Sequence, residues 1–189
     1  MFISVIDLFK IGIGPSSSHT MGPMVAAKDF RDRIQAFLIS HPVPPFLHVR
    51  CTLRGSLAFT GKGHATDRAV ILGLAGQTPT TVDPDTADAI IDEIKASKRI
   101  TPPGHPTYRF DPATDLVLDR KTALPGHANG MVFYAHDTDD HLILRRVYYS
   151  IGGGFVVSDE ELQRAKSPRG AASGPTVPYP FRNAVEMLA

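Results

Sequence analysis

The sequence of 189 residues predicts an α+β fold, in which a mixed β-sheet is layered with helices. Apolar residues recur at helical spacing between Ala27 and Leu38, and they alternate with polar residues from Leu47 to Leu53. After Leu53, expected strands and helices interleave irregularly along the chain. That order favours an α+β arrangement over a regular parallel fold.

The first half of the chain should contain most of the helices. The first long helix follows Pro23 and stops before His41, and residues 4–9 should form one or two helical turns. The strand at Leu47 should have one solvated face and continue through Gly55–Phe59 into a polar turn. Two more helices are expected, at residues 66–74 and from Asp83, the second with a buried stripe of Ile90, Ile91 and Ile94.

The second half should contain mainly strands that are separated by glycine-rich and proline-rich loops. Strands are expected at residues 107–110, 115–118, 131–136, 142–150 and 155–157. Gly152–Gly154 should break the last long strand, and Ser158 should cap a short helix. We expect residues 1–158 to form one domain, and residues 159–189 to be a linker and the start of a further, catalytic domain of a longer protein.

Composition excludes several classes of function. A formal net charge of +1 provides no basic field for nucleic acid, and no apolar run is long enough to span a membrane. The single cysteine, Cys51, excludes an internal disulfide and fits a reducing compartment, so a cytoplasmic protein is expected. The residues from Gly55 to Lys62 lack the spacing of a phosphate-binding P-loop.

Small hydroxyl residues gather just before the first long helix. Ser16, Ser17, Ser18, His19 and Thr20 precede it, and residues of this kind cap helix N-termini. Because free N–H groups and a partial positive charge meet there, the stretch suits a carboxylate or a phosphate. A capped loop without a ligand is the alternative.

Three histidines share one kind of setting. His19, His64 and His127 each lie in a polar loop flanked by glycine, and imidazole transfers protons near neutral pH. The polar neighbours of the last two are Lys62, Thr66, Asp67 and Asn129. The other histidines should be surface or turn residues, namely His41, His48, His105, His136 and His141. No metal motif is expected, and Cys51 should be a small buried apolar residue.

Five stretches together resemble the N-terminal β domain of bacterial iron–sulfur L-serine dehydratases of the single-chain type. They are residues 13–23, 55–67, 127–130, 148–155 and 177–181. The resemblance implies conversion of L-serine to pyruvate and ammonia in serine catabolism and gluconeogenesis, without pyridoxal phosphate. It also implies a [4Fe–4S] cluster held by three cysteines, with one iron open as a Lewis acid. Because this chain has one cysteine, the cluster must belong to a catalytic α domain outside it, and the chain alone should be inactive.

The resemblance also implies roles for particular residues and a fold similar to the allosteric substrate-binding domain of phosphoglycerate dehydrogenase. His127 and His64 would form the acid–base pair, with His19 as a neutral hydrogen-bonding partner. The substrate carboxylate would lie among Ser16, Ser17, Ser18 and Thr20, and the site would be oriented by Lys62, Thr66, Asp67 and Asn129. The implied partners are L-serine, the α domain of the same polypeptide and a second copy in a homodimer.

Two other interpretations stay open. The same serine, histidine and lysine residues fit a regulatory domain that binds a small carboxylate and has no catalytic residues. A weaker alternative is the free β subunit of a dehydratase made of two chains, against which residues 177–189 argue because they resemble the start of a further domain. The catalytic interpretation requires the three histidine loops, far apart along the chain, to converge at one rim.

Overall fold

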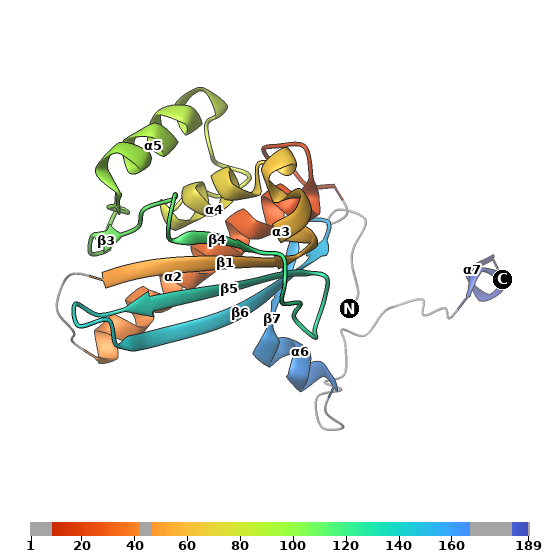
Figure 1. Cartoon of the computed structure of the whole chain (residues 1–189). Coiled ribbons are helices and arrows are strands. Elements are labelled where there is room, and N and C mark those ends of the chain that lie inside the picture. Colours follow the sequence, from red (N-terminus) through yellow and green to blue (C-terminus); the bar gives the residue numbers. More distant parts are fainter. Residues whose placement is uncertain (1–8, 42–46, 167–182, 189) are drawn as a thin grey trace.

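The computed structural model describes residues 9–41, 47–166 and 183–188, and it confirms the α+β class. The described strands form one mixed sheet in the order β2-β3-β1-β5-β6-β7, with β4 also paired to β1 (Figure 1). Strand β1 is parallel to β3 and β4 but antiparallel to β5. The strands are β1 (Leu47–Gly55), β2 (Arg99–Ile100), β3 (Tyr108–Arg109), β4 (Leu116–Asp119), β5 (Asn129–His136), β6 (Leu142–Gly152) and β7 (Phe155–Ser158).

Helices cover one face of this sheet. Figure 1 shows α2 running behind the strands, with α4 beside it and α5 farther from the sheet. A π-helical turn, η1, leads directly into α2, and a 3-10 turn, η2, precedes α4. The helical elements are η1 (Ser17–Met21), α2 (Gly22–Ser40), α3 (Ser56–Thr60), η2 (Gly61–His64), α4 (Thr66–Leu74), α5 (Pro84–Ser97), α6 (Asp159–Lys166) and α7 (Ala184–Leu188).

The main core lies between the sheet and helices α2 and α4. The apolar residues of β1, from Leu47 to Leu53, are fully buried there. Phe30 of α2 stacks on Phe133 of β5 with the ring centroids 5.2 Å apart. A smaller cluster on the opposite face joins Val132, Val147 and Tyr149 to side chains that include Leu162 of α6.

The local patterns of the sequence are confirmed in most of these elements. Helix α5 has its carboxylate cap at Asp83, which accepts a hydrogen bond from the Asp85 N–H. Ser158 caps α6, because its hydroxyl accepts the N–H of Glu161 while the Glu161 carboxylate accepts the N–H of Ser158. The expected helical turns of residues 4–9 and the linker of residues 167–180 lie almost entirely outside the described residues.

The outer face of β1 is only partly solvated, and the prediction of a surface position for His48 is wrong. Arg50 is exposed, but His48 is only 8% exposed. The Nε2 atom of His48 lies 2.9 Å from the carboxylate of the buried Asp115, which lies in the loop directly before β4. Alternation along a strand identifies the two faces but does not reveal a loop that folds over one of them.

The expectation that the strand continues to Phe59 is also wrong, because β1 ends at Gly55. Gly55 has φ 58° and ψ −134°, a conformation that residues with a Cβ rarely adopt. The chain turns there into α3, and the N–H of Ser56 donates to the carbonyl of Ala128 at 2.9 Å. The turn therefore brings the residues after β1 against the loop that contains His127.

We expect Gly55→Ala to destabilise the fold by about 2 kcal/mol, because an added Cβ would overlap the Ala128 carbonyl oxygen in a strained backbone. Urea denaturation followed by circular dichroism measures the change. Gly63→Ala is the matched control, since a Cβ at Gly63 meets nothing within 4 Å. Equal stability of the two variants would contradict this account of Gly55.

Candidate functional site

The serine-rich stretch forms a capped and widened first turn before α2. The Ser16 hydroxyl accepts the N–H of His19 at 3.2 Å, and the Ser16 carbonyl accepts the N–H groups of Thr20 and Met21. Ser17 is exposed, and Ser18 is partly buried. π-Helical turns are rare and are often found at functional sites. The positive end of the helix is thus presented beside two serine hydroxyls.

His19 is fixed by hydrogen bonds at both ring nitrogens. Its Nδ1 lies 2.9 Å from the Ser18 hydroxyl and its Nε2 lies 3.0 Å from the Ser56 hydroxyl. A neutral imidazole has one donor and one acceptor nitrogen, so one serine donates to the ring and the other accepts from it. Ser56 was not among the predicted site residues, although its position directly after a glycine at the end of the clearest strand was a signal.

The loops of His19 and His64 are joined by two threonines in a reciprocal arrangement. Thr20 donates its hydroxyl to the carbonyl of His64 at 2.7 Å, and Thr66 donates its hydroxyl to the carbonyl of His19 at 2.6 Å. Both threonines are buried, with exposures of 3% and 0%. The two imidazole rings consequently lie with their centroids 4.9 Å apart.

The hydrogen bonds of His64 and His127 define opposite tautomers. The Nδ1 atom of His64 lies 2.9 Å from the carbonyl of Thr60, and a carbonyl only accepts, so Nδ1 carries the hydrogen. The Nδ1 atom of His127 accepts the N–H of Asn129 at 3.1 Å, so the hydrogen of the neutral ring is on Nε2. His64 therefore presents a lone pair at Nε2, and His127 presents an N–H.

The loop of His127 is attached to the same end of β1. Asn129 pairs with Gly55 across the sheet, and its side-chain amide donates to the carbonyl of Ser150 at 3.1 Å. With the Ser56–Ala128 hydrogen bond, these contacts place the loop beside the residue that holds His19. Within the described structure, the ring of His127 neither stacks on nor hydrogen-bonds to the other two rings.

Lys62 and Asp67 line a different feature. They border a cavity of about 380 Å³ between α4, α5 and β4, together with apolar residues such as Ile71 and Leu116. The carboxylate of Asp67 accepts the N–H of Arg68. None of the three loop histidines lines this cavity, although Lys62 belongs to the same short turn as His64.

Burial and a neighbouring charge both act on His19. Partial burial lowers the pKa of the His19 ring, and the charged form of His64 lowers it further. His19 is thus favoured in its neutral form. The position of this ring, rather than the helix end alone, explains why a neutral hydrogen-bonding role suits it.

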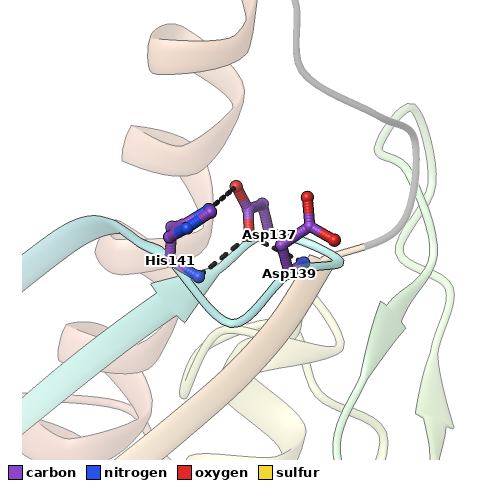
Figure 2. A group of neighbouring side chains, drawn as sticks. All are labelled: Asp137, Asp139 and His141. Atoms are coloured by element: carbon purple, nitrogen blue, oxygen red, sulfur yellow. Dashed lines mark hydrogen bonds and ion pairs between the residues drawn. The ribbon is translucent and has the colours of Figure 1, made fainter.

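Asp137, Asp139 and His141 form a separate polar group at the turn between β5 and β6. Their ligand-type atoms lie within 4.8 Å of one another, and Figure 2 shows Asp137 between the other two side chains. The Asp137 carboxylate accepts the N–H groups of Asp139 and His141, both at 2.9 Å. These turn hydrogen bonds account for the grouping.

Two comparisons place the chain among known proteins. Residues 4–161 match the family described as serine dehydratase beta chain. The chain is 46% identical over 188 residues to an L-serine dehydratase of Streptomyces coelicolor, and 42% identical over 188 residues to L-serine dehydratase 1 of Escherichia coli. It is also 37% identical over 185 residues to an L-serine dehydratase of Helicobacter pylori strain 26695.

These alignments cover nearly all of this chain but only part of each relative. They span 100%, 99% and 98% of the chain, and 40%, 39% and 39% of the three relatives. The chain thus spans about two fifths of the length of the relatives that it matches. Within its described residues, no helix is both long and apolar enough to cross a membrane.

We expect Thr66→Val to destabilise the fold by about 1–3 kcal/mol, because it leaves the carbonyl of His19 without its buried donor at nearly constant side-chain volume. Thr60→Val is the control, since the Thr60 hydroxyl is exposed and bonds within its own helix; its effect should stay within about 0.5 kcal/mol. Denaturant unfolding measures both. Similar losses in the two variants would remove the special role of Thr66.

We expect the His19 ring to titrate below the ordinary value of 6.5 in an NMR titration. The unfolded chain then binds a proton at this histidine more readily than the folded chain does. The free energy of unfolding therefore decreases as the pH falls through 6.5. His64→Gln should raise the His19 pKa by removing a positive neighbour, while His41→Gln should not change it. A His19 midpoint at or above 6.5 would contradict the burial argument.

Proposed function

The chain belongs to the serine dehydratase beta chain family, and we propose that it acts as the β domain of an L-serine ammonia-lyase, which converts L-serine to pyruvate and ammonia. The observation that supports this most strongly is the meeting of the His19, His64 and His127 loops at one end of β1. Two of their rings lie 4.9 Å apart, and the third loop is hydrogen-bonded to the residue that holds His19.

The residues of this chain do not fit an iron–sulfur cluster. Such a cluster needs several thiolate ligands, and the only cysteine of the sequence is Cys51. Cys51 is fully buried in β1, and burial raises the pKa of its thiol well above the usual range. We therefore assign the [4Fe–4S] cluster of the proposed enzyme to cysteines of an α domain outside this chain, and we assign no role to pyridoxal phosphate.

The first turn before α2 is proposed to bind the substrate carboxylate. Ser16 already accepts the N–H groups of His19, Thr20 and Met21, so the hydroxyls and N–H groups of Ser17 and Ser18 are the groups proposed to face an anion. Ser18 also touches His19, so carboxylate binding and the orientation of the ring are connected. The hydroxyl of Thr20 donates to the backbone carbonyl of His64, so Thr20 is proposed to position that loop and not to contact the substrate.

The tautomers of His64 and His127 suit them to opposite roles in proton transfer. The Nε2 lone pair of His64 is proposed to take the Cα proton of L-serine, so that the C–H electron pair forms the Cα–Cβ double bond as the C–O bond to the β-hydroxyl breaks. The Nε2–H of His127 donates a hydrogen bond to the departing oxygen. Protonated His64 then returns its proton to the hydroxide, which gives water. The remaining 2-aminoacrylate hydrolyses to pyruvate and ammonia.

His19, Ser56 and the two threonines are proposed as positioning residues. Both ring nitrogens of His19 are already hydrogen-bonded, so the ring is poorly suited to accept a further proton. Its place against His64 instead sets the direction in which His64 faces. The Thr66 hydroxyl holds the backbone at His19 in place. Asn129 holds both His127 and the end of β6.

The proposed assembly has an α domain as its partner, on the same polypeptide, and two copies of the whole protein in a cytoplasmic homodimer. The three fifths of each relative that this chain does not cover is long enough for such a domain. We propose residues 1–158 as the core of the β domain. Helix α6 packs on it through Leu162 and through a hydrogen bond from the Tyr149 hydroxyl to Asp159.

In the enzyme that contains this chain and its α domain, we expect His64→Ala and His127→Ala each to lower kcat by about a hundredfold or more, the usual effect of losing a group that handles a proton. His41→Ala, at the exposed end of α2, is the control and should leave kcat unchanged. Turnover of L-serine is followed by pyruvate formation. Near-normal turnover of both variants, with unchanged cluster content, would exclude these residues from the chemistry.

A further inference from the structure

A second polar cavity lies at the opposite end of β1 from the histidine loops. It has a volume of about 300 Å³ and is lined by His48, Arg50, Arg109, Asp137, Thr138 and Asp140. Arg50 and the end of β1 at Gly55 are five strand positions apart, which corresponds to roughly 17 Å. A small molecule in this cavity therefore cannot touch the histidine pair.

One side of the cavity presents guanidinium groups whose hydrogen-bonding capacity is largely unused. Arg109 lies opposite His48 in the pairing of β1 with β3, and it is exposed. Its backbone takes part in the sheet pairing, but within the described residues its guanidinium group makes no hydrogen bond and no ion pair. Arg50 lies 3.7 Å from Asp115 and 3.9 Å from Asp140, distances that are too long for hydrogen bonds. Both side chains therefore retain donors for a carboxylate.

The other side of the cavity presents carboxylates. The turn shown in Figure 2 holds Asp137 in place through the N–H groups of Asp139 and His141. These hydrogen bonds lower the pKa of Asp137, so it stays ionised at neutral pH. Asp140, with its side chain 66% exposed, adds a second negative charge at the same rim.

The buried carboxylate of Asp115 contacts His48 and Arg50 of the cavity lining, and it already has hydrogen-bond partners within the protein. Asp115 accepts from His48 at 2.9 Å and from the N–H of Asp111 at 2.7 Å. Its hydrogen-bonding capacity is thus used within the protein, and the groups at the rim of the cavity face a ligand. The charged groups at the rim are two guanidinium groups on the strands and two carboxylates on the turn.

We propose that this cavity binds the zwitterion of a free α-amino acid, with the α-carboxylate on Arg50 and Arg109 and the α-ammonium group on Asp137 and Asp140. A simple anion would meet the two carboxylates of the turn, and a simple cation would meet the two guanidinium groups of the strands. A zwitterion satisfies both sides at once, and the volume suits a small amino acid. The proposal concerns a site distinct from the histidine loops and does not rest on their chemistry.

The test is a calorimetric titration of the chain with L-serine, N-acetyl-L-serine and L-serine methyl ester, with the binding site located by NMR shifts. We expect saturable binding of L-serine with shifts at the start of β1 and at the β5–β6 turn. Each analogue lacks one charge and should bind at least about tenfold more weakly, as should L-serine to the Arg109→Gln variant. Arg145→Gln is the matched control, because Arg145 is exposed on β6 of the same sheet but does not line the cavity.

Several results would overturn the proposal. Equal binding of N-acetyl-L-serine would identify a simple anion site, and absence of saturable binding at millimolar L-serine would leave no site. Binding that survives Arg109→Gln, or shifts confined to the His19 and His64 loops, would place the amino acid elsewhere. A His64→Ala variant separates the two sites: it should retain binding at this cavity even where turnover is lost, so the two proposals fail independently.

Discussion

Two buried threonine hydroxyls hold the histidine loops together. Thr20 and Thr66 come from segments that are far apart in the chain, and each donates to the carbonyl of the histidine in the other segment. A buried carbonyl without a donor costs free energy, so separating the loops would leave two such groups unsatisfied. The 4.9 Å approach of the two rings depends on this pair of hydrogen bonds. Every chemical role proposed for His64 assumes that approach.

Strand β1 supplies the frame for both polar features of the molecule. At its C-terminal end, Gly55 turns the chain so that Ser56 reaches His19 and the loop that contains His127. At its N-terminal end, His48 and Arg50 face the second cavity. Because the apolar side of β1 is fully buried against the helices, the strand cannot shift its register without exposing that side. The two features are thus fixed relative to each other.

Local patterns predicted much of the fold and part of the site. The helix at residues 66–74, the buried side of β1 and the cap at Ser158 each depend on residues close in sequence, and all are confirmed. The continuation of β1 to Phe59 was wrong, because the Ala128 carbonyl that packs on Gly55 comes from a distant loop. Ser56 was missed and His48 was misplaced for the same reason, since their partners are His19 and Asp115.

Spacing and residue type were enough to identify an α+β chain with three histidines in polar loops, because helix and strand periodicity and imidazole chemistry are local properties. The tautomers of His64 and His127, the neutral state of His19 and the contact between the rings of His19 and His64 depend on the folded chain. A hydrogen bond or a buried charge requires two groups at defined positions in space. Those positions exist only once β1, β5 and α4 have packed together.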